Sequence, residues 1–241
     1  MANGRLQWDA TGEHFFETGV DHGVLYVLEE TNDNDDYGKY GVGVVWNGLT
    51  TVSENPSGAE PTALWADNIK YLNLMSAEDF ACTIEAYTYP DKFMECDGSA
   101  ALTEGVYIRQ QKRKTFGFTY RTRIGNDEQG DDLGYKIHIV YGCLASPSER
   151  SYATVNDSPE AITFSWEVNT TPIDVGTVGG TDFRPTAYLE IDSREFTETA
   201  ARAKLTALED FLYGKDNSTA QATDGNEPRL PLPAKVYALL H

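Results

Sequence analysis

The chain has 241 residues and is 40% hydrophobic, with 14 Tyr, 10 Phe and 4 Trp, which excludes general disorder and allows one large β-rich domain. Its 19 basic and 38 acidic residues give a formal net charge of −19, which excludes duplex nucleic-acid binding through the net field. Three cysteines without CxxC spacing, no apolar leader and no bilayer-length apolar run predict a soluble protein of a reducing cytosol with free, mostly buried thiols.

The first part of the chain predicts a β-hairpin followed by a long loop. Residues 1–22 are polar with scattered aromatic residues and are typical of an arm or an irregular strand. We predict strands at 23–28 and 40–46, separated by an acidic loop at 29–36. Residues 49–67 show no convincing periodicity, so we predict a long loop there. A loop of that length inside a compact domain suggests a function of its own.

The clearest signal is a period of two in three later runs, at 114–121, 135–141 and 162–168. Before them we expect strands at 69–74 and 81–89, joined by a possible helical turn at 76–79, and a connector at 90–103. A period of two is typical of a strand with one buried face, so the three runs predict an antiparallel sheet packed on its bulky side. The other face carries small residues: Thr115, Gly117, Thr119, Gly142, Thr163 and Ser165. This face is either solvent surface, a smooth lining or a surface against which another backbone packs closely.

The last third predicts one helix and an apolar end. A loose stretch at 169–185 precedes a short strand at 187–191 and a helix at 197–213, which Thr197 can cap and Gly214 can end. Residues 215–227 are typical of a flexible linker, and 228–240 of an extended Pro-rich piece with an apolar tip. That tip either folds back onto its own sheet or docks on another subunit. We therefore divide the chain into a single domain at 1–213 and a linker with an apolar arm at 214–241.

A search for catalytic groups finds almost nothing. There is no GxSxG, P-loop or paired Cys and His, and His138 on a predicted strand favours a structural role. The acidic loop at 33–38 resembles a calcium loop, but its twelfth position is Val44 instead of a bidentate carboxylate. Glu85 and Glu167 could form a glycosidase-like pair, although single carboxylates on strands mostly face solvent. We therefore predict that the protein is not an enzyme and uses no cofactor or metal.

Six of the 19 basic residues lie between positions 109 and 123: Arg109, Lys112, Arg113, Lys114, Arg121 and Arg123. They either pair with acidic neighbours of their own chain or form a patch that meets acidic loops of another copy, such as 127–132 or 29–36. Nucleic-acid binding is disfavoured, because the nearby aromatic residues alternate into the core. Long aperiodic loops, a small-residue sheet face and an apolar end together suggest a protein that completes its folding by assembly.

Segments spread over most of the chain resemble a known family at near-constant spacing. They are VWNGL at 45–49, SGAEPT at 57–62, ADNIKYL at 66–72, AYTYPD at 86–91, QKRKTFG at 111–117, IGND at 124–127, VYGCLA at 140–145, SWEV at 165–168 and PRLPLP at 228–233. In these segments the chain resembles the major tail proteins, or tail tube proteins, of long-tailed siphovirus-type bacteriophages. Residues 19–39 and 175–183 depart from the resemblance, and we treat them as variable loops.

The resemblance implies a mainly β (α+β) fold: an antiparallel β-sandwich or barrel flanked by one α-helix, with long loops and terminal arms. It also implies homo-hexameric rings that stack into a tube for the viral DNA, with tape measure, tail terminator and distal tail proteins as further partners. The loop that reaches the next ring would be 49–67, with Leu49, Asn55, Pro56, Gly58, Glu60 and Pro61 as its candidate residues. A negatively charged lumen would let DNA pass without binding it.

We therefore expect a structural virion protein that is present in the host cytoplasm before assembly and in the tail tube afterwards, without a membrane. The competing hypothesis is a β-sandwich binding module, for carbohydrate or a host surface, of a phage baseplate or related protein. That hypothesis requires a cluster of exposed Trp and Tyr, whereas most aromatic residues here alternate inward on predicted strands.

Overall fold

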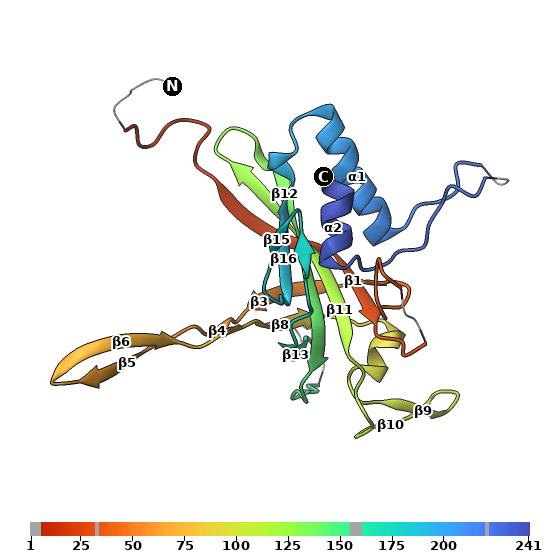
Figure 1. Cartoon of the computed structure of the whole chain (residues 1–241). Helices are drawn as coiled ribbons and strands as arrows, with labels where there is room; N and C mark the ends of the chain where they lie inside the picture. Colours follow the sequence, from red (N-terminus) through yellow and green to blue (C-terminus); the bar gives the residue numbers. More distant parts are fainter. Residues whose placement is uncertain (1–5, 32–33, 155–160, 220–221) are drawn as a thin grey trace.

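A computed structural model describes residues 6–31, 34–154, 161–219 and 222–241. It shows a curved antiparallel sheet with helices packed on one side and several hairpins that project from it (Figure 1). The predicted fold class, a mainly β sandwich or barrel with a flanking helix, is confirmed.

The main sheet has eight strands within the described residues, and their order is β2-β1-β11-β12-β13-β8-β3, with β16 also paired to β12. β12 switches its partner from β16 to β13 near Gly142, whose φ is +60°. Only residues 47 and 48 separate β2 from β3 at the two ends of this order, so the sheet curves back on itself like a barrel. The strands are β1 (Phe16–Val27), β2 (Val44–Trp46), β3 (Leu49–Glu54), β8 (Ala81–Ala86), β11 (Phe116–Asn126), β12 (Gly130–Ala145), β13 (Phe164–Thr170) and β16 (Tyr188–Asp192).

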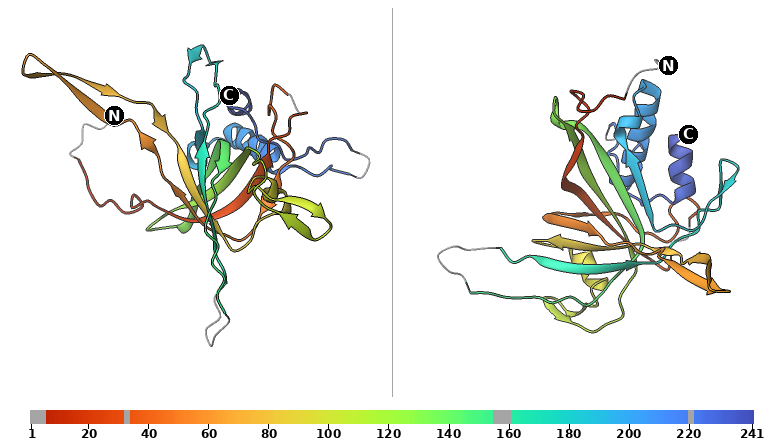
Figure 2. Two further views of the ribbon diagram at one scale, coloured as in Figure 1. Left: turned by 90° about the horizontal axis from the view of Figure 1, so that it is seen from below. Right: turned by 90° about the vertical axis from the view of Figure 1, so that its left-hand side faces the viewer.

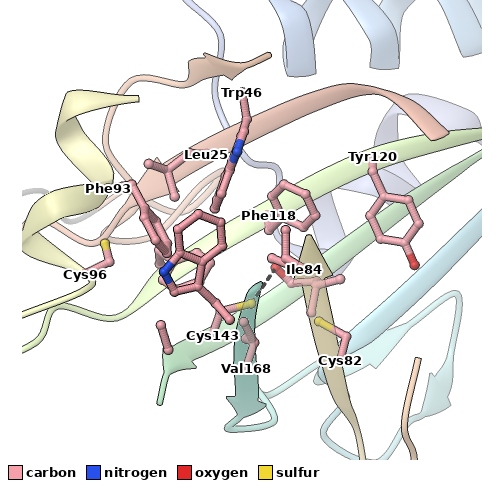
Figure 3. Close-up of a cluster of buried hydrophobic side chains, with 14 of the residues drawn as sticks. Leu25, Trp46, Cys82, Ile84, Phe93, Cys96, Phe118, Tyr120, Cys143 and Val168 are labelled. Atoms are coloured by element: carbon pink, nitrogen blue, oxygen red, sulfur yellow. Dashed lines mark hydrogen bonds between the residues drawn. The ribbon is translucent and has the colours of Figure 1, made fainter. Parts of the chain in front are cut away.

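The concave side of the sheet holds an aromatic core (Figure 3). The ring of Trp46 lies 4.5 Å from that of Phe93, which comes from the 3₁₀ helix η1 (Asp91–Glu95), and 5.5 Å from those of Phe118 and Trp166. Its indole nitrogen donates a hydrogen bond to the Thr88 carbonyl (2.9 Å). The expected free and buried thiols are confirmed in the described chain, at Cys82, Cys96 and Cys143.

The other face of the sheet is also buried, which corrects the expectation of one bulky side. In the β11–β12 register Phe118 pairs with Val140, whereas Thr119 pairs with Ile139. Paired residues share a face, so the large residues of the two runs lie on opposite faces of the sheet. The second core lies under the helices α1 (Thr199–Tyr213) and α2 (Pro233–Leu240) and contains Val24, Tyr26, Tyr40, Ile137, Ile139, Tyr141, Ile191, Leu205, Leu208, Leu212, Leu230 and Val236.

The C-terminal segment folds back onto this second face. Leu230 is fully buried, and a Cβ built on Gly117 would lie only 2.1 Å from its side chain. The Tyr141 hydroxyl donates a hydrogen bond to the Pro231 carbonyl (2.7 Å). Thr119, also on this face, is fully buried. Of the small residues singled out in the sequence, Gly117 therefore makes room for a close neighbour, Leu230. Thr163 instead lies at the solvent surface.

Both ends of the helical region differ in detail from the prediction. α1 begins at Thr199 with Glu198, instead of Thr197, at the capping position, and Gly214 ends it with a φ of +83°. Residues 233–240, predicted to be extended, form α2 with Pro233 in the first turn, where proline is favoured. Neither helix of the described chain is long and apolar enough to span a membrane.

Residues 49–67, predicted to be a loop, lie mostly in strands, so this prediction was wrong. After β3 the chain runs outward through β4 (Ser57–Gly58) and β5 (Pro61–Ala66) and returns through β6 (Ile69–Met75) and β7 (Glu78–Asp79). β7 also replaces the predicted helical turn. Asp67 and Asn68 form the turn with φ of 49° and 63°, as expected for a type I′ hairpin. We call residues 55–80 the arm, which projects far from the sheet (Figures 1 and 2).

Two shorter hairpins form where the sequence predicted no strand. β9 (Ala100–Thr103) pairs with β10 (Val106–Ile108), and β14 (Thr177–Val178) pairs with β15 (Thr181–Asp182). A second 3₁₀ helix, η2 (Ser193–Glu195), links β16 to the residues before α1. The predicted strands at 23–28, 40–46, 69–74, 81–89 and 187–191 correspond to all or part of β1, β2, β6, β8 and β16.

Candidate assembly surfaces

The arm exposes large apolar side chains to solvent. No residue from 53 to 79 is buried, and the exposed fractions of Trp65, Tyr71 and Met75 are 68%, 67% and 69%. Leu64 pairs with Leu72 across the arm. Leu74 lies two residues along the same strand, so the three leucines share one face. Exposed apolar side chains gathered on one element are typical of surfaces that bind other macromolecules.

Most of the predicted inter-ring residues lie on the outgoing half of the arm. The side chain of Asn55 donates to Thr83 Oγ1 (3.1 Å) and holds the arm to β8, and Pro56 follows it. Gly58 pairs with Glu78, and a Cβ on Gly58 would lie 2.3 Å from the Ala77 carbonyl oxygen. Glu60 and Pro61 are exposed where β5 begins. Leu49 is separate from this group, because it starts β3 and packs against the aromatic core around Trp46.

An anchor that the sequence did not predict fixes the root of the arm. Glu54, the last residue of β3, accepts hydrogen bonds from the hydroxyls of Tyr120 (2.7 Å) and Tyr188 (3.1 Å) on the same carboxylate oxygen. On the returning strand, the ring of Phe80 stacks on that of Tyr188 at 4.7 Å. Both strands of the arm are thus tied to the sheet at the same point, which sets the direction in which the arm leaves.

His138 belongs to this anchor and has the structural role that the sequence favours. Its ring is buried and stacks on Tyr120 at 4.5 Å. Its nitrogens lie 2.8 Å from Thr122 Oγ1 and 2.6 Å from the Tyr188 hydroxyl. Burial lowers the pKa of His138 despite the nearby Glu54, so the ring is neutral at pH 7 and orients Tyr188 through a hydrogen bond.

The six clustered cations separate into two groups. Four of them contact acidic neighbours in their own chain, as the plainer interpretation expects. Arg113 lies 3.9 Å from Asp97, Lys114 2.5 Å from Glu95, Arg121 2.8 Å from Asp21 and Arg123 3.4 Å from Asp131. Arg109 and Lys112 are exposed and have no ion-pair partner within the described residues.

Arg121 and Arg123 line a groove of about 1050 Å³ between the β11–β12 hairpin and the start of α1. Asp21 accepts two hydrogen bonds from Arg121, at 2.8 and 3.0 Å, and forms an ion pair with Arg123 at 3.5 Å. Partial burial raises the pKa of Asp21, but Arg121 and His22 outweigh burial and hold it at about 2. The groove is therefore lined by paired charges, and its two predicted cations are already neutralised.

Arg109 and Lys112 adjoin the β9–β10 hairpin, whose first strand lies in the predicted connector at 90–103. All residues from 101 to 112 are exposed. The exposed fraction is 67% for Leu102 and 51% for Tyr107, and Val106 and Ile108 are exposed as well. The signal in the sequence was two short apolar runs, at 100–102 and 106–108, on either side of Gly105, which has a φ of +75°.

The two carboxylates considered for catalysis, Glu85 and Glu167, lie on the neighbouring strands β8 and β13. Glu85 pairs with Ser165 and Glu167 with Thr83, so the two carboxylates are offset on neighbouring strands. Within the described part of the chain, no three His, Cys, Asp or Glu side chains come together as metal ligands. The calcium-like loop lies partly outside the described residues, because Asp33 is not among them.

Comparisons of the chain with models of protein families and with curated proteins find no match. The surfaces described above and the resemblance of the sequence segments are therefore the basis for a functional proposal.

Proposed function

We propose that the chain is the structural subunit of a phage tail tube. In this proposal copies associate into rings, six to a ring by the resemblance, and the rings stack into a tube through which viral DNA passes. Tape measure, tail terminator and distal tail proteins are its further partners, and the subunit waits in the host cytoplasm before it joins the virion.

The observation that carries the proposal is the arm. Its apolar side chains cannot reach the core of their own chain, because the arm projects away from the sheet (Figure 2). Exposing them in a permanent monomer would favour aggregation, whereas burial against another copy removes them from water. The anchored root, through Glu54 and Phe80, presents this surface in a fixed direction, as a repeating contact requires.

Charge and symmetry also support a tube. A contact between two different surfaces of the same subunit builds rings when the rotation closes and filaments when it does not. An arm that leaves the body on one side supplies one half of such a contact. The net charge of −19 favours passage of DNA along the wall over binding to it.

A second candidate is the β-sandwich binding module. Trp65 and Tyr71 are both exposed on the arm, so aromatic residues are available at the surface. Their neighbours are mainly aliphatic, with Leu64, Leu72 and Met75 among them, and the polar groups close by are those of Lys70, which pairs with Trp65, and Asn73. The surface is thus better suited to protein than to carbohydrate. Glycan binding by the monomer, measured by calorimetry, would favour this second function.

Negative-stain electron microscopy of concentrated purified protein tests the tube. We expect rings or tubes from the wild-type chain and none from the variant Leu64→Ser/Leu72→Ser/Leu74→Ser, because the arm loses its apolar face. The variant should keep the wild-type Tm, since no residue from 53 to 79 is buried in the monomer. Ile162→Ser, a change of an exposed residue outside the arm, is the control and should assemble normally. Particles that remain featureless monomers at every concentration would contradict the proposal.

A further inference from the structure

The β9–β10 hairpin combines an apolar surface with unpaired positive charge. Tyr107 and Ile108 are exposed on β10, and Arg109 and Lys112 follow them without an ion-pair partner in the described chain. Glu104 is the one carboxylate from 101 to 112. In a protein with a formal charge of −19, such a locally basic and apolar surface fits a partner that is apolar and acidic.

The arm has that complementary chemistry. Its leucine face is flanked by exposed carboxylates, and Lys70 is the one basic residue of the arm. None of these charged groups forms an ion pair within the described residues. The carboxylates are Glu60, Asp67, Glu78 and Asp79. Opposite charges around two apolar surfaces steer an encounter and fix its register, while the apolar centre supplies most of the binding free energy.

The two surfaces cannot meet within one chain. The arm and the β9–β10 hairpin leave the body on opposite sides, as both Figure 1 and the left view of Figure 2 show. A donor surface on one side and an acceptor surface on the other side allow head-to-tail association of identical copies. Each copy then buries its arm on the next copy and receives an arm from the previous one.

We propose that the β9–β10 hairpin, with Arg109 and Lys112, is the acceptor surface for the arm of a second copy. The inference deepens the proposed tube function, because it identifies the two surfaces that join subunits. The occupant is another copy of this chain: the arm is exposed, acidic and apolar, and it is present in the same concentration as the acceptor.

A charge-exchange experiment tests this contact in the full chain. The acceptor variant is Arg109→Glu/Lys112→Glu, and the arm variant is Glu60→Lys/Glu78→Lys. Asp67 is left unchanged, because its positive φ in the turn suits Asp better than Lys. The combined variant carries both pairs of changes and keeps the wild-type net charge. Arg184→Glu/Lys215→Glu, which changes two exposed cations elsewhere, is the charge-matched control for the acceptor variant.

Sedimentation equilibrium gives the Kd for association of each variant. We expect the acceptor variant and the arm variant each to raise the Kd about tenfold or more, and the combined variant to return it to within about threefold of wild type. The control should leave the Kd within about threefold of the wild-type value. Failure of the combined variant to recover, or a wild-type Kd in either single-surface variant, would overturn the contact.

Microscopy of the same samples separates this inference from the tube itself. If both single-surface variants still form tubes like those of the wild-type chain, the proposed acceptor surface is refuted and the proposed tube function is not. Small closed oligomers that obey the charge exchange but never stack would support the contact and refute the tube. A wild-type chain that stays monomeric at the highest soluble concentration would overturn both.

Discussion

At the scale of single residues, the pairing of Asp21 with Arg121 shows how a cation cluster in the sequence is divided by the fold. Asp21 lies on β1 and Arg121 on β11, and these two residues are partners in the strand register. The sequence showed the cations but could not show which strand would lie beside them, because pairing across 100 residues depends on the tertiary fold. Arg109 and Lys112, which form no ion pair in the part of the chain that the structure describes, are the cations on which the acceptor proposal rests.

This pairing makes part of the stability dependent on pH. The folded pKa of Asp21, about 2, lies below its usual value of 3.8, so its stabilising effect is present above about pH 4 and is lost as the pH falls toward 2. Because the group is partly exposed, we expect only about 1 kcal/mol. Asp21→Asn should lower the free energy of unfolding by that amount at pH 6 and by only about a third of it near pH 2.5. Urea unfolding at both pH values measures the difference.

The control for this experiment is Asp67→Asn, which removes a carboxylate at the exposed tip of the arm with no ion pair in the described chain. Its effect on the free energy of unfolding should be small at both pH values. A difference between wild type and Asp21→Asn that stays constant from pH 6 to pH 2.5 would show that the pair with Arg121 does not set the stability.

At the scale of elements, the sequence predicted strands well where hydrophobicity alternates and poorly where it does not. β11, β12 and β13 were expected because one face of each strand is rich in large residues. Of the strands of the arm, β6 was predicted at 69–74, whereas β4 and β5 were missed because both of their faces are exposed and no buried face imposes an alternating pattern. The face on which each strand packs was also beyond the sequence, because a shift of one residue in register exchanges the two faces. The anchor at Glu54 depends on that same register.

The packing of the C-terminal segment on β11 gives a prediction at this scale. Gly117→Ala places a methyl group against Leu230 and Tyr40, and such overpacking costs about 1–3 kcal/mol of unfolding free energy. Leu230→Ala removes a fully buried side chain and costs about 2–5 kcal/mol. The double variant should lose less than the sum of the two, because the new methyl group occupies part of the space left by Leu230.

Urea unfolding at a concentration where sedimentation shows only monomer measures this coupling. The low concentration is essential, because the segment could dock on a neighbouring copy in an assembly. Additive losses in the monomer would mean that residues 228–233 do not pack on β11 of their own chain in solution. Tyr237→Ala, on the exposed side of α2, is the control and should show no coupling to Gly117→Ala.

At the scale of the whole molecule, assembly must overcome the repulsion between copies that each carry a formal charge of −19. The screening length is about 30 Å at 0.01 M salt and about 8 Å at 0.15 M, so added salt weakens this long-range repulsion first. Close pairs at a partly dehydrated contact, such as the one proposed for Arg109 and Lys112, are screened much less. The apolar surface of the arm is not weakened by salt, and sulfate strengthens its burial. Added salt should therefore weaken the repulsion between copies more than it weakens the contact between them.

We therefore predict that assembly increases between 0.01 M and 0.15 M NaCl and increases further when sulfate replaces chloride at equal ionic strength. Sedimentation velocity at fixed protein concentration measures the assembled fraction. The Leu64→Ser/Leu72→Ser/Leu74→Ser variant should lose the response to sulfate, because that response depends on apolar burial by the arm. An assembled fraction that falls steadily as the NaCl concentration rises would mean that ion pairs, instead of the apolar arm, hold the copies together. The leucine face would then not be the main source of binding free energy.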